Sequence, residues 1–369
     1  MFLPSKTPSY SVLLNSESAD LDSPRENEIH SDSILQKKRF AGLYRICTAI
    51  AVVCVSAVAF VTIFFSSSSK HQFTCTHPRI RPEWRTLSHA EKTSYIAAAH
   101  CLTTTPSPRN SNITVHDDFS YLHSRTGNYS HNAAPFLPWH RYFLHAYEHA
   151  LKEYCHYTGP LPYWDWSLDY RNLIESPIWD TDDGFGPSGS SFTSVANGRC
   201  VDQGPFANWM PTYYEGNYHP HCLSRGFQDE TIVTRVGNLT VRPDILQGVI
   251  RDKSEYFDFL LAVETMSHLT IPYIVQGDFS KVTAPNDPVF FLHHAQVDRV
   301  WWSWQGVHDE RRRKYNGIAR YDSTAEASVS DVLDLGFILE NGAVVTVEDV
   351  MDAEGSLLCY RYDTSAMSN

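Results

Sequence analysis

The sequence has little positive charge. Its 30 Lys and Arg residues are outnumbered by 42 Asp and Glu residues, and the formal net charge is −12. No stripe of Lys and Arg residues runs against this balance. Because nucleic-acid binding needs a basic protein surface, the composition excludes nucleic acid as a partner. The chain also lacks an internal repeat. With 42% hydrophobic residues, it can bury a sizeable core in one large domain or two small ones.

One segment lacks charge altogether. Residues 46–65 read ICTAIAVVCVSAVAFVTIFF, which matches the roughly 20 apolar residues that a helix needs to cross a bilayer. Only Lys70 follows this segment closely, whereas a basic cluster comes directly before it. The cluster consists of Lys37, Lys38, Arg39 and Arg45. Since basic flanks stay in the cytosol, the asymmetry sets the expected orientation of the span.

This orientation divides the chain into three expected parts. Residues 1–45 are predicted to be a disordered cytosolic tail, residues 46–66 a transmembrane signal anchor, and residues 67–369 a lumenal or extracellular domain. The protein would then be a single-pass type II membrane protein of the secretory pathway. A cleaved signal peptide is the alternative, but the long leader and the long apolar run fit it less well.

Cysteines and glycosylation sequons agree with a lumenal domain. The cysteines after the apolar segment are even in number, as expected for disulfides in an oxidising compartment, although the sequence leaves their pairing open. They are Cys75, Cys101, Cys155, Cys200, Cys222 and Cys359. Three N-x-S/T sequons begin at Asn112, Asn128 and Asn238, which are therefore predicted glycosylation sites.

Helical patterns dominate the expected secondary structure. Ser88 and Glu91 form a capping-box pattern. The expected helices span about 88–101, a short stretch from 117, 138–153, 257–268 and 288–304. Residues 124–135 and the Gly-rich, Ser-rich stretch 180–222 are predicted to be loops, and 344–362 to be extended.

Two motifs place histidines at the starts of helices. They are Ala134–Arg141 (APFLPWHR) and Asn286–Arg299 (NDPVFFLHHAQVDR). In both, an imidazole points inward from a wall of aromatic residues. Neutral imidazole suits copper, iron and zinc, and an all-histidine site without Cys or carboxylate ligands favours copper. Copper in such a site supports oxygen chemistry, so the pattern predicts an oxidase.

The histidines fall into two expected metal-binding clusters. The first is His123, His131 and His140, spaced for a helix, a loop and the next helix. The second contains His268 and His294.

Three neighbours of His294 on its helix have expected roles. Phe290 lies one turn before His294 and is expected to cover the pocket. Asp298 lies one turn after it and is expected to hold a histidine or an arginine in place. His293 points about 100° away from His294 on a helix, so the two are not expected to bind the same ion.

These motifs resemble those of the tyrosinase-like, or type 3 copper, proteins of fungi. The resemblance covers roughly residues 75–362. It rests on Phe136–Arg141 (FLPWHR), Pro162–Trp166 (PYWDW) and Asp287–Asp298, and Cys359–Tyr362 (CYRY) looks like the tyrosine motif that closes the family's core domain. It implies a mainly α-helical domain with a central four-helix bundle, long loops and little β-structure. It also implies two copper ions, which bind O₂ between them and oxidise a phenol or catechol.

The chain departs from the family pattern at its second cluster. The family carries a helical H-x-x-x-H pair there, but this chain reads His268-Leu-Thr-Ile-Pro272. A proline cannot ligate and breaks a helix, so the second copper site is short of one ligand. Another group is needed to replace it, and the candidates are His219, His221 and Glu264. Leu269 also stands where members that hydroxylate monophenols often carry an asparagine.

The resemblance leads to a functional hypothesis with alternatives. Short, anchored proteins of this kind resemble those of fungal gene clusters that make modified cyclic peptides. The substrate is therefore expected to be a phenol, such as a tyrosine residue in a peptide-derived secondary metabolite. With Pro272 in the metal shell, a catalytically impaired lumenal scaffold is the alternative. A second alternative is a zinc protease, because His145-Ala-Tyr-Glu148-His149 fits the inverted H-x-x-E-H signature.

Overall fold

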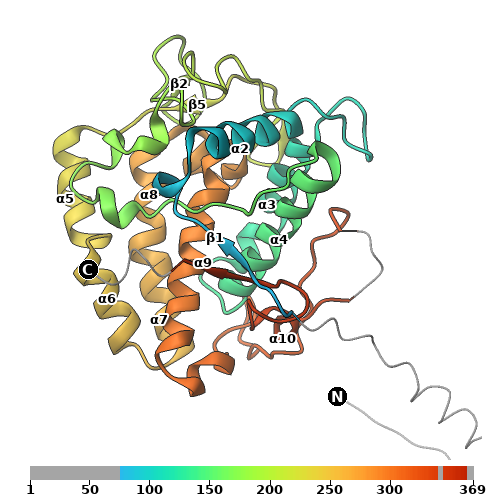
Figure 1. Cartoon of the computed structure of the whole chain (residues 1–369), viewed down its shortest axis with the longest axis vertical. Coiled ribbons are helices and arrows are strands. Elements are labelled where there is room, and N and C mark those ends of the chain that lie inside the picture. The colour runs from blue at the N-terminus through green and yellow to red at the C-terminus, as the bar shows by residue number, and fades with distance from the viewer. Residues whose placement is uncertain (1–74, 340–343, 364–369) are drawn as a thin grey trace, which may run out of the picture. The chain divides into compact units, whose positions relative to one another are not determined.

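Helices are the main regular secondary structure of the computed structural model, which describes residues 75–339 and 344–363 (Figure 1). Its α-helices are α2 (His89–Leu102), α3 (Val115–Ser130), α4 (Phe136–Cys155), α5 (Glu230–Thr240), α6 (Pro243–Asp252), α7 (Tyr256–Ala262), α8 (Leu269–Val275), α9 (Val289–Val307) and α10 (Val347–Val350). A π-helix, η5 (Val263–His268), joins α7 to α8. Short 3₁₀ turns are η1 (Trp84–Thr86), η2 (Trp166–Asp169), η3 (Leu173–Glu175), η4 (Pro177–Trp179), η6 (Gly277–Ser280), η7 (Ala284–Asn286) and η8 (Asp309–Arg313).

The few strands form short two-stranded ladders. β1 (Arg79–Arg81) pairs in parallel with β6 (Tyr360–Tyr362). The other strands are β2 (Arg199–Cys200), β3 (Tyr213–Tyr214), β4 (Asn217–Tyr218) and β5 (Ser224–Arg225), with β2 antiparallel to β5 and β3 antiparallel to β4. The prediction of a mainly α-helical domain with little β-structure is confirmed for the described residues.

The predicted membrane anchor at residues 46–66 and the tail at 1–45 lie outside the described residues. Within the described ranges, no helix combines the length and the apolar character needed to cross a bilayer.

α4 and α9 form the centre of the fold, and both are buried on almost every face. Every residue from 289 to 301 of α9 is buried, and α4 buries most of its first four turns. A helix that is buried on all sides belongs to a core, and the polar side chains that it carries need partners there. α3 and the continuous segment α7–η5–α8 lie beside this pair (Figure 1). The four histidine-bearing segments thus surround one interior, as the expected four-helix bundle requires.

The first histidine helix is longer than the sequence analysis predicted. α3 begins at Val115, because Thr114 and Asp117 form a reciprocal capping box, and it continues to Ser130. The prediction of a loop from residue 124 is therefore wrong for residues 124–130. Gly127 lowers intrinsic helix propensity there, but packing of α3 into the core outweighs this local preference. His131 is the C-cap of α3, not a residue in the middle of a loop.

Pro272 does not end its helix, contrary to expectation. It lies inside α8, directly after the π-helix η5. A proline ring in a regular helix clashes with the carbonyl four residues earlier, which here belongs to His268. η5 ends at His268, and its wider turn changes the path of the chain at that point. The clash that would break the helix is thereby avoided.

The C-terminal stretch was predicted to be extended, and this is wrong for most of it. Residues 347–350 form α10, and only Tyr360–Tyr362 is a strand. β6 pairs with β1, and the disulfide Cys75–Cys359 lies beside this pairing. The other disulfides are Cys101–Cys155 and Cys200–Cys222, so all six cysteines predicted to be paired are paired.

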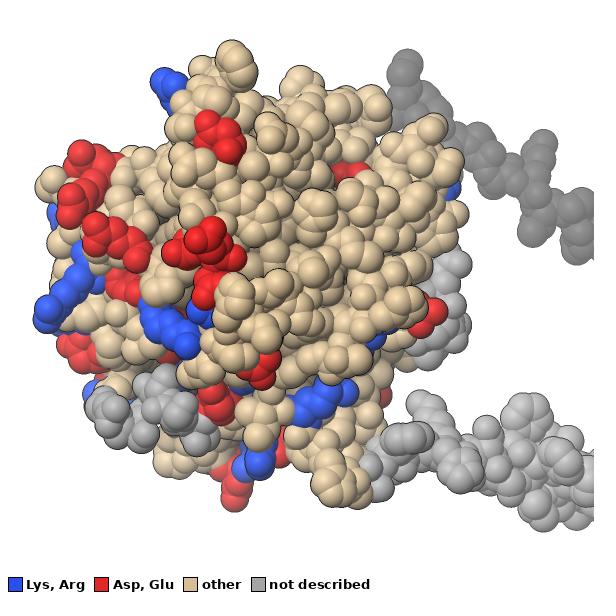
Figure 2. All heavy atoms as spheres, turned by 45° about the horizontal axis from the view of Figure 1, so that its top comes forward, with Lys and Arg blue, Asp and Glu red and all other residues tan. Residues whose placement is uncertain are grey.

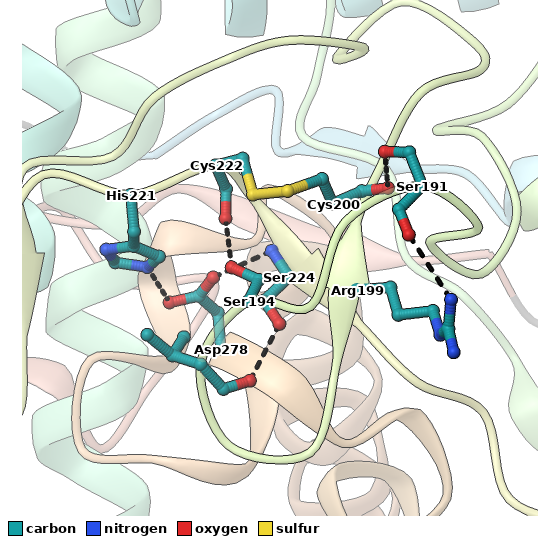
Figure 3. Close-up of a disulfide and its surroundings, with 9 residues drawn as sticks. Ser191, Ser194, Arg199, Cys200, His221, Cys222, Ser224 and Asp278 are labelled. Atoms are coloured by element: carbon teal, nitrogen blue, oxygen red, sulfur yellow. Dashed lines mark hydrogen bonds and ion pairs between the residues drawn. A yellow bond between two sulfur atoms is a disulfide. The ribbon is translucent and has the colours of Figure 1, made fainter.

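The long stretch at 180–222 is irregular, as predicted, and is closed by Cys200–Cys222 (Figure 3). Next to this disulfide, Nε2 of His221 lies 2.9 Å from Oδ1 of Asp278. The other carboxylate oxygen of Asp278 accepts from the backbone N–H of Ser224 at 2.9 Å. Since Asp278 belongs to η6, these bonds tie the excursion to the chain just before α9.

Two of the three predicted glycosylation sites have described side chains. Asn112 lies in an exposed turn before α3. Asn238 lies on α5, partly buried, and its side-chain amide donates to the carbonyl of Thr234 at 2.8 Å. Position 128 lies within α3. Glycosylation of all three stays a prediction, and Asn112 is the more accessible of the two described side chains.

On one face of the molecule the charged side chains are unevenly distributed. Figure 2 shows acidic and basic side chains interspersed on one side of the view, while a broad area beside them carries neither.

In the H-x-x-E-H motif of α4, the glutamate forms buried ion pairs that stabilise the fold. Glu148 is 2% exposed and accepts hydrogen bonds from Arg79 at 3.1 Å, Arg81 at 3.0 Å and Lys152 at 2.6 Å. A carboxylate held by three cations cannot act as the free base of a metalloprotease. His145 and His149 also belong to no group of three convergent ligands among the described residues. The protease alternative is therefore wrong.

The ion pairs of Glu148 predict that the folded protein loses stability in acid. Burial alone would raise the pKa of this carboxyl, but Arg81, Lys152 and Arg79 lower it from 4.5 to about 2. A lowered carboxyl pKa contributes stability above the unfolded value, and this contribution is lost as the pH falls towards 2. Glu148→Gln should therefore be less stable than the wild type at pH 6. The difference between the unfolding free energies of the two proteins should narrow by about 3 kcal/mol by pH 2. Denaturant unfolding of both proteins between pH 6 and pH 2 measures this difference.

The control is Asp244→Asn, which removes the exposed pair with Arg242. Its unfolding free energy should stay close to the wild-type value, because exposed ion pairs contribute little. If the unfolding free energies of the wild type and Glu148→Gln change with pH in parallel, the ion pairs of Glu148 do not stabilise the fold as proposed.

Candidate metal centre

The first predicted cluster comes together in space. His123 lies on α3, His131 caps its C-terminus, and His140 lies one turn into α4. One ring nitrogen from each lies within 4.8 Å of the others. The spacing of a helix, a turn and a second helix thus brings three distant imidazoles to one point.

The outer nitrogens of these three rings are held by the protein. Nδ1 of His123 donates to the carbonyl of Val282 and Nδ1 of His140 to that of Phe136, both at 2.7 Å. Nδ1 of His131 lies 2.9 Å from Oε1 of Glu264. Because a carbonyl only accepts, Nδ1 of His123 and of His140 must carry the hydrogen, which leaves Nε2 as a free electron-pair donor. Such outer partners orient metal-binding histidines.

The free nitrogens of His123 and His140 face each other. Their Nε2 atoms lie 3.4 Å apart, and in the neutral rings neither carries a hydrogen. Two buried acceptors at this distance repel each other unless a cation lies between them. The arrangement therefore fits a bound metal ion.

The second cluster contains one histidine that the sequence analysis excluded. His268 ends η5, and His293 and His294 follow one another on α9. One ring nitrogen from each of the three lies within 4.8 Å of the others. The expectation that His293 points away from the ligands is wrong. The 100° step separates Cα–Cβ directions, but two flexible side chains can bring their ring nitrogens back together. Adjacent histidines on a fully buried helix were the available signal.

The candidates for the missing ligand lie elsewhere. His219 is exposed, and His221 is engaged with Asp278. Glu264 is 1% exposed, and its carboxylate accepts from His131 and from the backbone N–H of Asn132 at 2.9 Å. None of the three joins the cluster of His268. Glu264 instead positions a histidine of the first cluster.

Burial keeps five of these six imidazoles neutral. Burial, with the charge of His131 second, lowers the pKa of His123 to about 3. Burial also lowers the pKa of His293 to about 3, and it lowers the pKa values of His140, His268 and His294 well below 6.5. Neutral imidazole is the form that binds a metal, so the donor set suits copper at neutral pH.

The two clusters lie face to face at one cavity. The rings of His140 and His294 stack with centroids 4.2 Å apart, and those of His131 and His268 lie 5.5 Å apart. The cavity has a volume of about 340 Å³. The phenyl ring of Phe290 lies 4.2 Å from the ring of His294 and 5.1 Å from that of His123. This side chain also lines the cavity, where a pocket cover is expected.

Asp298 holds an arginine, which is one of its two expected roles. Its Oδ1 accepts from Nε of Arg141 at 2.5 Å. Its Oδ2 accepts from the hydroxyls of Tyr360 and Tyr362 at 2.5 and 2.6 Å. Arg141 directly follows His140 on α4. Asp298 thus fixes α4 against α9 and β6 behind the histidines.

Comparisons with known proteins agree with this geometry. Residues 93–307 match the family model described as the common central domain of tyrosinase. The chain belongs to the tyrosinase family. It is 41% identical over 341 residues to the tyrosinase-like protein phomQ2 of Diaporthe leptostromiformis, covering 89% of this chain and 86% of that protein. It is 40% identical over 334 residues to tyrosinase ustQ of Aspergillus flavus, covering 89% and 92%.

The fold also matches solved structures. A mutant polyphenol oxidase from Thermothelomyces thermophila superimposes with a TM-score of 0.67 at 27% identity, over 78% of this chain and 89% of that one. Tyrosinases are type 3 dicopper enzymes, and the chain is accordingly a tyrosinase-family copper oxidoreductase. Its two histidine triads fit one copper ion each.

The contact between Glu264 and His131 can be tested by metal affinity. Glu264→Leu removes the acceptor that orients His131, so affinity for the first copper should fall by about 10–100-fold. Glu264→Gln is the matched control, because its amide oxygen still accepts from Nδ1. Competition with a copper chelator measures both. Equal affinities for the Leu variant and the wild type would refute the positioning role.

Proposed function

We propose that this protein uses O₂ and two copper ions to oxidise a phenolic substrate. The observation that carries the proposal is a pair of facing histidine triads at one cavity. Copper held there would accept electrons from the phenol and pass them to O₂. The chain itself supplies neutral ligands, excludes water by burial, and positions a ring against them through Phe290.

The cavity favours a single aromatic ring. Its volume of about 340 Å³ is at the small end of the roughly 300–1,000 Å³ of pockets that hold drug-sized ligands. Leu269 and Tyr321 line it and are 47% and 64% exposed. Tyr273, one turn after Leu269 on α8, is 46% exposed. An apolar rim of this kind suits the remainder of a larger molecule. We therefore propose a tyrosine residue of a small peptide, such as a precursor of a fungal secondary metabolite.

The alternative of an impaired scaffold depended on the ligand that Pro272 removes. One ring nitrogen of His293 lies within 4.8 Å of one from each of the remaining two histidines of that cluster. The geometry therefore favours the enzyme over the scaffold.

The cellular location is proposed as lumenal or extracellular, behind an anchor at residues 46–66. Three disulfides in the described part of the chain support an oxidising compartment. The uncharged sequence of residues 46–65 supports the anchor.

Copper analysis combined with oxygen uptake tests the function. The wild-type chain should bind two copper ions and consume O₂ with a catechol and with a short tyrosine-containing peptide. His140→Ala removes a ligand of the first cluster, so it should bind one copper fewer and lose oxygen uptake, because the reaction needs both metal ions. Wild-type protein that binds two copper ions but consumes no O₂ with any phenol would disprove the oxidase and favour the scaffold.

A further inference from the structure

We propose that His293 is the third ligand of the second copper ion, in place of the histidine that Pro272 removes from the family pattern. The site would then use two adjacent residues of one helix, His293 and His294, together with His268. This inference rests on the proposed function, because it concerns the same dicopper site.

The environment of His293 is the first argument. Its side chain is fully buried, at 0% exposure, and neither ring nitrogen has a hydrogen-bond partner among the described residues. Buried polar atoms are almost always paired, so an imidazole with two unpaired nitrogens needs an explanation. The adjacent rings are aromatic: Phe279 lies 5.7 Å and Trp166 6.4 Å away between centroids. Neither ring accepts or donates a conventional hydrogen bond to it.

The placement of the three rings is the second argument. The ring of His293 lies 5.2 Å from that of His268 at an angle of 28°, and 5.0 Å from that of His294 at 78°. His293 also lines the same cavity as the other two. One donor atom from each of the three rings therefore lies within 4.8 Å of the others, beside the cavity.

Pro272 supplies the third argument. It lines this cavity from α8, one turn after His268, so its ring occupies the side from which the family's second histidine would reach the metal. His293 approaches from α9 instead. The π-helix η5 ends at His268 and sets the position of the one ligand that this segment still provides.

The two sites should differ in their affinity for copper. In the first triad each Nδ1 has a protein partner: Val282, Glu264 or Phe136. In the second triad the Nδ1 atoms of His268, His293 and His294 have none among the described residues. Since outer partners raise metal affinity about 10–100-fold, the second copper should dissociate first under a chelator.

The test measures copper content and affinity in the full-length chain. His293→Phe keeps a planar ring in the core and removes both nitrogens, so it should bind one copper where the wild type binds two. If a second ion is still taken up, its affinity should fall more than the roughly 100-fold cost of losing an orienting group. The matched control is His116→Phe, a buried histidine of α3 outside both triads. It should keep two copper ions.

The outcomes separate this inference from the proposed function. Two copper ions bound with wild-type affinity by His293→Phe overturn the role of His293 and leave the oxidase intact. One copper or none in the wild type overturns both. Near-ultraviolet circular dichroism and the copper-dependent rise in Tm check folding. If the Phe variant is not folded, His293→Gln, which keeps a polar side chain, is measured in the same way against the same expectation.

Discussion

The fold depends on one unfavourable arrangement: six imidazoles with free nitrogens face each other in an apolar interior. Burial holds the pKa values of five of them below the ordinary value, so protonation of these five does not relieve the repulsion between neighbouring nitrogens. A protein core pairs nearly all its polar groups, and a pair of cations is the partner that these rings suit. The rest of the structure holds the rings in the positions in which they can bind such ions.

The histidines are held by groups from distant parts of the chain. Val282 orients His123 through its carbonyl, and Glu264 orients His131 through its carboxylate. Asp278 accepts a hydrogen bond from the side-chain amide of Asn286 across the loop that contains Val282, and it also contacts His221 of the disulfide-closed excursion. The irregular stretch at 180–222 thus supports one wall of the cavity, although it contributes no ligand. The stretch is closed by its own disulfide, and its end is hydrogen-bonded to Asp278 in η6.

Much of the fold was predictable from local patterns. The capping box at Ser88 begins α2 as expected, and the apolar motifs predict α4 and α9. The predictions failed where packing or an unusual turn outweighed propensity. α3 continues through Gly127 because it lies in the core, and α8 continues through Pro272 because a π-helix precedes it.

The sequence by itself determined which residue types meet: aromatic-flanked imidazoles on helices, paired cysteines and an acidic, mostly helical domain. Local spacing is enough for this, because it depends only on helix periodicity and on the chemistry of each side chain. Tertiary structure decided which partners those groups have. Glu264 became a support of His131, Asp298 a partner of Arg141, and His293 a neighbour of His268. These outcomes depend on how side chains from separate helices fill one interior, which no spacing along the chain contains.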